Sequence, residues 1–471
     1  MLTAIAHVDR DTGMRMVLEA LRHAEFDTAA TQASASQLWP HDPLGAPTSG
    51  PDRLPGRVTT STMSSKVAKV SVVIPTYNRC ALLAETLRGL ARQNLPTDEF
   101  EVIVADDGSS DATPDVVKSF ADRLRLKYHF QEDLGFRVSA ARNAGVRLAD
   151  APLLVFLDTG ALVGPDYLRH HLAAHADPAT PRAVIGYAYA YRPEDPTPGL
   201  AAMVDRALPE RVVDIYSGDP SFWDNRHGEF LACDFDPGRR VVPWMLFWAT
   251  NCSVRTEDYW AVGGFDEDFQ RWGVEDMELG FRLFQRNIPF TLSRSAWVIE
   301  GPHEREWESN MDSNHHNIEM LLNKHPEPVN EIGFALLTKD QYWSWENDYR
   351  ALLDWAAEAR DLDVAKELQE AVEGLQPGDR VAVLGCGPQV PAGLSSAVLF
   401  DFDRDLLERA LANTAYTGHH ALGLRTPLPD HSVDVVLITS RLRGMFDRWG
   451  LDLVREARRI GREVRAPGLE S

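Results

Sequence analysis

Acidic side chains follow two short runs of aliphatic residues, at the points where each run ends. Asp106 and Asp107 close the run that begins at Phe100, and Asp158 closes PLLVFLD. In open parallel sheets, ligands bind at the carboxyl ends of strands, where a carboxylate can accept a hydrogen bond from an N–H group or a ribose hydroxyl. Asp is also frequent in turns and caps, so each acid taken alone fits a local structural role. Three such acids at strand ends favour a ligand site.

A second acidic pair lies in FQRWGVEDMELGFRL (Phe269–Leu283), where Glu275 and Asp276 follow a Trp–Gly turn. We expect a helix to begin at this pair, and its dipole would stabilise both carboxylates in the ionised form. One of them can therefore act as a general base toward an incoming hydroxyl. Acids in the first turn are also common structural features of helices, and the residues alone leave both interpretations open.

Aromatic and cationic side chains accompany these acids. The loop PTYNR (Pro75–Arg79) follows the first predicted strand and offers an aromatic ring and a cation above the sheet edge. Arg137, Arg142 and Asn143 precede the strand that ends in Asp158. Together these groups are suited to hold a base, a ribose and phosphates.

The elements that must position these residues alternate between strand and helix. Buried strands are predicted at Val70–Pro75, Phe100–Asp111, Leu126–Phe130 and Pro152–Asp158, and helices at Ala81–Gln93, Ala112–Leu124 and Ser139–Ala149. Such alternation predicts an α/β fold with a parallel sheet. A helical stretch follows at Tyr342–Leu375, and a further strand opens at Val381.

Composition limits the class of protein and its partners. The chain has 471 residues, of which 44% are apolar, and its 48 basic and 70 acidic residues give a net charge of −22. Such acidity argues against a nucleic-acid partner. We find no apolar run of membrane-spanning length and no signal pattern, and the four scattered cysteines are expected to be reduced thiols, so we expect a cytoplasmic protein.

We divide the chain into four parts. Residues 1–66 are predicted to hold a short helix at Met14–Arg22 and a disordered linker, because Ala29–Ser65 is poor in apolar periodicity. Residues 67–330 are expected to form the main domain, 331–376 a helical connector, and 377–471 a small α/β module.

The motifs within 69–303 resemble those of an inverting family 2 glycosyltransferase of the GT-A fold. The resemblance is carried by VSVVIPTYNR, VIVADDGSSDAT, GFRVSAARNAG and FLDTGALVGPDYL. The later stretch ATNCSVRTEDYWAVGGFDEDFQRWGVEDMELGFRL resembles the acceptor half shared by chondroitin-polymerase-type and galactosyltransferase-type enzymes. The resemblance implies a GT-A mixed sheet flanked by helices and transfer of a sugar from a nucleotide-diphospho-sugar, with inversion.

The resemblance also implies roles for individual residues. Those implied to bind the donor, expected to be a UDP-sugar, are Pro75, Thr76, Tyr77, Arg79, Asp107, Arg137, Arg142 and Asp158. Asp276 is implied to deprotonate the acceptor while Glu275 orients it. Trp248, Asn251 and Trp272 would line the sugar site, although each Trp equally fits core packing.

One position departs from the family pattern. The D-x-D motif reads Asp158-Thr159-Gly160, so the second acid is missing. Asp158 and His303, which resembles a late metal-binding histidine, remain as ligands for Mn²⁺ or Mg²⁺, with the diphosphate completing the shell. Alternatively, arginines replace the metal, or the domain is a degenerate carbohydrate- or nucleotide-binding module.

The last part resembles a truncated class I methyltransferase. VAVLGCGP (Val381–Pro388) resembles the first glycine motif, and Asp401 the acid that ends the next strand. The spacing between them is short, and a lone glycine loop is a weak signal. We therefore favour a docking or dimerisation module that supports a homo-oligomer over methyl transfer.

The predicted function is that of an inverting glycosyltransferase. Its acceptor is a hydroxyl or thiol on a soluble glycan, a small molecule or a peptide, and the residues do not decide among these. The alternatives are the degenerate binding protein and a bifunctional glycosyltransferase and methyltransferase. A screen of nucleotide-sugars for thermal stabilisation would narrow the choice of donor.

Overall fold

The computed structural model describes residues 58–59, 67–192, 197–301, 307–391, 393–394, 396–412, 414–467 and 469. The predicted helix at Met14–Arg22 and most of the predicted linker lie outside the described residues. Within that linker, strand β1 (Val58–Thr59) pairs antiparallel with Tyr128 and Lys127, which differs from the disorder predicted there.

The described residues form two compact units. One comprises residues within Pro55–Leu321 together with Asp340–Glu346, and the other comprises residues within Leu322–Lys339 and Asn347–Ser471. We refer to them as the first unit and the second unit.

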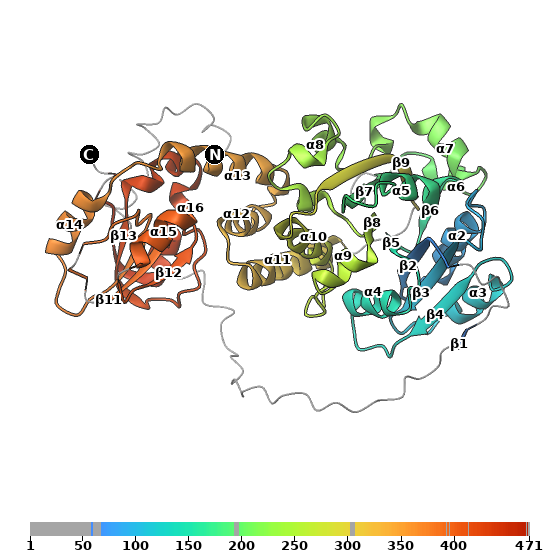
Figure 1. Cartoon of the computed structure of the whole chain (residues 1–471), viewed down its shortest axis with the longest axis horizontal. Coiled ribbons are helices and arrows are strands. Elements are labelled where there is room, and N and C mark those ends of the chain that lie inside the picture. The colour runs from blue at the N-terminus through green and yellow to red at the C-terminus, as the bar shows by residue number, and fades with distance from the viewer. Residues whose placement is uncertain are drawn as a thin grey trace. The chain divides into compact units, whose positions relative to one another are not determined.

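A nine-stranded mixed sheet runs through the described part of the first unit, in the order β1-β4-β3-β2-β5-β8-β7-β9-β6 (Figure 1). Besides β1, its strands are β2 (Val70–Thr76), β3 (Phe100–Asp106), β4 (Leu126–Phe130), β5 (Leu153–Leu157), β6 (Ala161–Val163), β7 (Ala183–Tyr189), β8 (Asn251–Arg255) and β9 (Phe290–Glu300). The predicted strands correspond to β2–β5, which pair in parallel. The sheet turns mixed at β8, which is antiparallel to both β5 and β7.

Helices surround this sheet. They are α2 (Cys80–Leu90), α3 (Thr113–Ser119), α4 (Val138–Arg147), α5 (Tyr167–Ala174), α6 (Leu200–Val204), α7 (Pro209–Tyr216), α8 (His227–Ala232), α9 (Thr256–Ala261), α10 (Glu275–Gln285) and α11 (Trp307–Lys324), whose last three residues belong to the second unit. The helix expected to begin at Glu275 is confirmed as α10.

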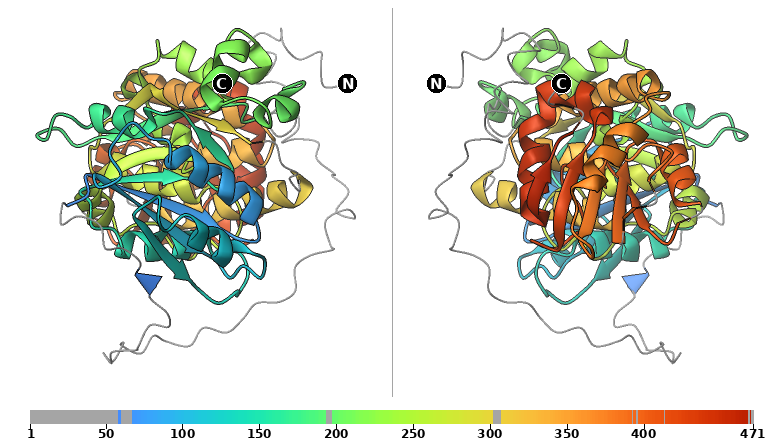
Figure 2. Two further views of the ribbon diagram at one scale, coloured as in Figure 1. Left: turned by 90° about the vertical axis from the view of Figure 1, so that its right-hand side faces the viewer. Right: turned by 90° about the vertical axis from the view of Figure 1, so that its left-hand side faces the viewer.

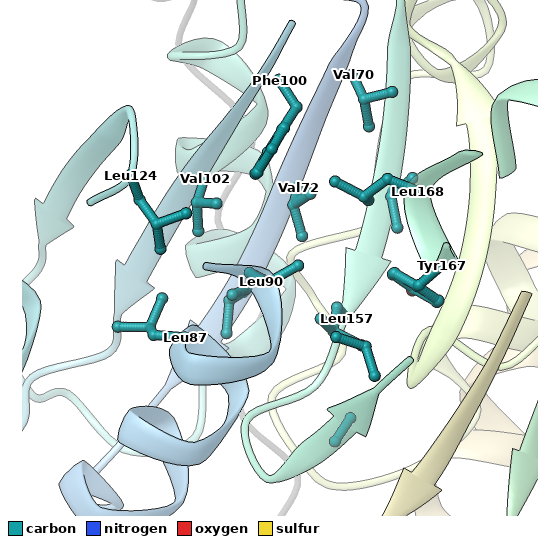
Figure 3. Packing of buried hydrophobic residues seen from close by; sticks show 14 of the residues in the cluster. Val70, Val72, Leu87, Leu90, Phe100, Val102, Leu124, Leu157, Tyr167 and Leu168 are labelled. Carbon is teal, nitrogen blue, oxygen red and sulfur yellow. The ribbon is translucent and has the colours of Figure 1, made fainter. Parts of the chain in front are cut away.

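The alternation of side chains along β2 explains how helices cover both faces of the sheet. Val70 and Val72 join Leu87 and Leu90 of α2 in one apolar core (Figure 3). Val73 points to the opposite face, because successive strand residues alternate. There it meets α4 at Gly145, where a Cβ atom would lie 2.8 Å from the Val73 side chain. A glycine is therefore required for this close approach of helix and strand.

The second unit holds a five-stranded parallel sheet in the order β12-β11-β10-β13-β14, whose strands lie side by side (Figure 2). The strands are β10 (Arg380–Leu384), β11 (Ser396–Asp401), β12 (Thr417–His420), β13 (Val433–Ile438) and β14 (Gly461–Arg465). Its helices are α12 (Pro328–Leu337), α13 (Trp345–Glu358), which starts in the first unit, α14 (Ala365–Glu373), α15 (Arg404–Leu411) and α16 (Phe446–Ile460).

A buried carboxylate ties α12 to this sheet. Glu331 accepts backbone N–H groups of Gly423, Leu424 and Arg425 at 3.0–3.2 Å, and also that of Leu422. The predicted helical connector is thus a series of separate helices, and α12 packs within the second unit. None of the described helices is long and apolar enough to cross a membrane.

Candidate active site

The carboxyl ends of β2 and β3 place the first predicted acids. Thr76 pairs with Asp106 at the end of the two strands, and the backbone N–H of Asp107 donates to the Thr76 carbonyl at 2.9 Å. The Asp106 carboxylate is fully buried and accepts the N–H groups of Gly108 and Ser109 and the hydroxyl of Tyr128. Asp106 therefore shapes the turn, and Asp107 is the acid at the sheet edge.

Asp107 organises the loop that follows β4. One of its oxygens accepts the amide N–H of Gln131 at 2.5 Å, and the other accepts the backbone N–H of Arg137 at 2.7 Å. The Arg137 guanidinium lies 3.7 Å from the same carboxylate. Burial raises the pKa of Asp107, which these hydrogen bonds counteract. Asp107 and Arg137, both predicted donor ligands, are thus brought together.

Tyr77 lies beside this loop. Its ring is 45% exposed, and its hydroxyl donates to Asp133 at 2.8 Å. That hydrogen bond raises the pKa of Tyr77. Arg79 is exposed at the start of α2, and the Pro75 carbonyl accepts the hydroxyl of Thr159 at 2.8 Å. An exposed ring held at a sheet edge is a suitable platform for a nucleobase.

Arg142 joins the two predicted halves of the site. From α4, one terminal nitrogen donates to Asp158 at 3.0 Å and the other donates to Glu275 at 3.1 Å. Its guanidinium also lies over the Phe265 ring, 5.0 Å from the centroid. Burial alone would lower the pKa of Arg142, but the charges of Asp158 and Glu275 outweigh it and the pKa is raised. Arg142 is 4% exposed, so it acts through these carboxylates.

Asp276 lies next to this bridge. Its carboxylate accepts the backbone N–H of Ala249 at 3.0 Å and that of Met277 at 2.8 Å. Burial, and then the neighbouring charge of Glu275, raise the pKa of Asp276 to about 7. A carboxylate with such a pKa is well matched to proton transfer near neutral pH. One oxygen of Glu275 is buried without a hydrogen-bond partner among the described residues, so it can accept from a ligand.

The start of α10 is held in an unusual backbone conformation. Gly273 has φ +93° and Val274, a β-branched residue, has φ +71°. The left-handed region is costly for valine and persists only where the surroundings enforce it. The buried side chain of Asn317 does this from α11, because its amide donates to the carbonyls of Arg271 at 3.0 Å and Gly273 at 2.6 Å. The role of Asn317 could not be predicted from the sequence, because no local pattern links it to a loop 44 residues away.

The three predicted sugar-site residues differ in their surroundings. Trp248 is partly exposed, and its indole N–H donates to the Met245 carbonyl at 3.0 Å. Trp272 is partly buried beside the loop that Asn317 holds. Asn251 is fully buried, and its amide bonds to Tyr167, His171 and the carbonyls of Tyr187 and Ala296. Asn251 therefore braces the core and does not line a sugar site, because all of its polar atoms have partners.

The position of the missing acid is a turn between β5 and β6. Gly160 has φ +100°, and its N–H donates to the hydroxyl of Thr86 at 2.9 Å. A Cβ atom there would lie 3.6 Å from the Leu82 side chain. His303 lies outside the described residues. Among the residues that the structure describes, no three His, Cys, Asp or Glu side chains cluster as a metal site. Asp158 retains one oxygen outside its bond to Arg142, which fits a single protein ligand to a cation that a diphosphate also binds.

Asp401, the acid singled out by the methyltransferase resemblance, is hydrogen-bonded to other groups of the protein. Both oxygens of Asp401 accept from the buried guanidinium of Arg441, at 2.9 and 3.1 Å. They also accept the backbone N–H groups of Gly387 and Asp403. This carboxylate serves as an internal counter-ion, and the arrangement gives no support to methyl transfer.

Two protein-family domains match stretches of the sequence that lie within the first unit. Residues 71–221 match the Glycosyl transferase family 2 domain, and residues 231–297 match the N-terminal domain of galactosyltransferase. The chain is 46% identical over 415 residues to validoxylamine A glucosyltransferase of Streptomyces hygroscopicus subsp. jinggangensis (strain 5008), covering 86% of this chain and 98% of the relative. It is 30% identical over 234 residues to chondroitin synthase of Escherichia coli, covering 48% of this chain and 34% of that enzyme.

A solved structure of Staphylococcus aureus TarS 1–349 aligns with a TM-score of 0.41 at 16% identity, over 83% of this chain and 89% of that chain. The mixed sheet with flanking helices and the match of its first half to the family 2 domain confirm the predicted GT-A fold. Because a relative of 46% identity is covered over nearly its whole length, the chain belongs to the family 2 glycosyltransferases and is a glycosyltransferase.

Proposed function

We propose that this enzyme transfers glucose from UDP-glucose, with inversion, to a hydroxyl of a small polyhydroxylated acceptor such as validoxylamine A. The name of the relative with 46% identity supports the sugar and the acceptor class. The observation that carries the mechanism is the Arg142 bridge, which joins Asp158 on the donor side to Glu275 on the acceptor side. It fixes the distance between the two halves that must meet in the reaction.

In the proposed reaction, Asp276 takes the proton of the acceptor hydroxyl, and the oxygen forms a bond to the anomeric carbon. The bond from that carbon to the diphosphate oxygen breaks on the opposite face, and its electron pair leaves with the UDP. The backbone N–H groups of Ala249 and Met277 hold the Asp276 carboxylate in place. The free oxygen of Glu275 accepts from a second hydroxyl and orients the acceptor.

On the donor side, we assign the base to the exposed ring of Tyr77 and the ribose to Asp107. Arg137 lies against Asp107, and we assign it to the diphosphate. Asp158 would hold a divalent cation together with the diphosphate, and that cation would neutralise charge on the leaving group. Arg142 has a positioning role, because its charge balances Asp158 and Glu275.

The test is direct. Purified protein is incubated with UDP-glucose, Mn²⁺ and validoxylamine A, and the glucosylated product and released UDP are measured by mass spectrometry. We expect both in equal amounts, and the anomeric configuration in the product is expected to be inverted. Binding of UDP-glucose without any transfer or hydrolysis would instead support a degenerate binding module.

A further inference from the structure

A short segment from late in the chain belongs to the first unit. Asp340–Glu346 packs there, although the residues on both sides of it belong to the second unit. The segment lies outside both family domains, which end at residues 221 and 297. Specific contacts must therefore hold these seven residues on the first unit.

Two anchors hold the segment, one on each side of Trp343. The Tyr342 hydroxyl donates to the Met245 carbonyl and lies 3.4 Å from the sulfur of Met277, which follows Asp276 directly. The Glu346 carboxylate accepts the backbone N–H groups of Val241 and Val242, the latter at 2.9 Å. Tyr342 is partly buried and its pKa is raised by burial, whereas Trp343 is left 36% exposed.

The exposed ring of Trp343 extends an aromatic group. Its centroid lies 6.4 Å from that of Trp248, and the Tyr191 ring lies 5.2 Å from Trp248 on an adjoining segment. Arg226 lies over the Trp248 ring at 4.5 Å, and it is fully buried in an ion pair with Asp224. One face of Trp248 is therefore covered by a fully buried cation, and all three rings retain exposed surface.

This aromatic group adjoins the proposed base. Trp248 immediately precedes Ala249, whose N–H donates to Asp276 at 3.0 Å. An acceptor ring held at Asp276 would therefore lie near Trp248, and the Trp343 ring is 6.4 Å from that of Trp248. Flat aromatic faces bind the C–H faces of sugars and cyclitols well.

We infer that Tyr191, Trp248 and Trp343 form an acceptor platform, and that Trp343 binds the second ring of an acceptor built from two linked polyhydroxylated six-membered rings. The inference rests on the proposed function and adds the acceptor class to it. Trp343 thereby selects two-ring acceptors over single-ring ones, although it does not touch the reacting atoms.

The test compares Trp343→Ala with Trp343→Phe and with Trp260→Ala, a control at an indole of 39% exposure on α9. With validoxylamine A, we expect Trp343→Ala to raise the acceptor KM about tenfold, with the loss in KM rather than kcat. Trp343→Phe should restore most of the affinity, and the KM for UDP-glucose and UDP release without acceptor should not change. Trp260→Ala should behave as the unaltered enzyme. Inhibition by a single-ring cyclitol, myo-inositol, should be the same in all variants.

An unchanged acceptor KM in Trp343→Ala would overturn the platform while leaving the proposed function intact. If the unaltered enzyme does not glucosylate validoxylamine A, the proposed acceptor fails. The platform is then tested alone by calorimetry in the presence of UDP, with trehalose and maltose as the two-ring probes. Binding of a disaccharide that Trp343→Ala loses would support it, and no binding of any of these by the unaltered enzyme would overturn it.

Discussion

The guanidinium of Arg142 donates to the carboxylate of Glu275 across 3.1 Å, joining two residues that are 133 positions apart in the chain. With the second bond to Asp158, one buried cation holds the end of β5 against the start of α10. The positions of the Asp158 and Glu275 carboxylates are therefore coupled.

Replacing Arg142 should damage both stability and the pH profile. Arg142→Met leaves Asp158 and Glu275 without their counter-charge, and breaking a buried ion pair costs about 3–5 kcal/mol of unfolding free energy. Because the Arg142 charge lowers the pKa of Asp276, its loss should also move the acidic limb of kcat/KM to higher pH. Urea unfolding and a pH–rate profile measure the two effects.

Arg147→Ala is the matched control for that experiment. Arg147 lies on the same helix and forms an ion pair with Glu267, but both side chains are about half exposed. Exposed pairs contribute at most about 1 kcal/mol. If Arg147→Ala cost as much stability as Arg142→Met, the bridge would have no special role.

The activity should depend on the ionisation of Asp276. Its pKa is raised to about 7, so the carboxylate that accepts the proton is present above that pH and lost below it. We expect kcat/KM for the acceptor to fall as the pH drops through about 7.

Asp276→Asn should reduce turnover by about 10²–10⁴, the usual contribution of a general base, and leave UDP-glucose affinity nearly unchanged. Asp268→Asn, an exposed acid on the preceding loop, serves as the control. Full activity of Asp276→Asn together with an inactive Glu275→Gln would exchange the two roles.

Asn317 should position the start of α10. Asn317→Ala removes the donor to the carbonyls of Arg271 and Gly273, and a hydrogen bond of this kind contributes about 0.5–1.5 kcal/mol. We expect a lower melting temperature and a lower kcat for transfer, with UDP-glucose affinity retained, because Glu275 would lose its fixed orientation. His316→Ala, at the exposed neighbouring position, should change neither quantity. Equal effects on donor affinity and transfer would indicate a purely structural role.

Introducing the missing second acid of the D-x-D motif at position 160 should destabilise the protein. Gly160 has φ +100°, and a side chain in the left-handed region costs about 1–2 kcal/mol. Gly160→Ala and Gly160→Asp should therefore be similarly destabilised. We expect Mn²⁺ to bind appreciably only together with UDP-glucose, because Asp158 is a single candidate protein ligand and the diphosphate would supply further oxygens. Calorimetric titration of Mn²⁺ with and without the nucleotide-sugar checks this, and tight binding to the donor-free protein would contradict it.

Local patterns predicted those parts of the fold and the site that depend on neighbouring residues. The β-branched run at Val70 predicted β2, and the Trp–Gly turn before Glu275 predicted the start of α10. The places of Asp107 and Asp158 at strand ends followed from the strands themselves.

Long-range partners could not be predicted in this way. Asn251 occurs in a motif of the acceptor half, but its amide is used by groups that only the folded sheet brings together, such as Tyr167 and Ala296. The ion pair between Asp401 and Arg441, 40 residues later, likewise could not be predicted from the sequence. A polar residue in a buried strand does give one usable signal, because its side chain must find partners inside the protein.

The path of the chain through Asp340–Glu346 limits how the two units could be separated by recombination or truncation of the gene. The polypeptide leaves the catalytic unit after Leu321, returns for seven residues and leaves again after Glu346. A recombination or truncation event at a single point between them removes either Tyr342 and Trp343 from the catalytic unit or α12 from the second unit. Gene fusion and loss, which readily exchange units joined by one linker, would here disrupt at least one of the two units. The two units are therefore expected to have evolved as one heritable piece, with acceptor choice and the C-terminal sheet changing together.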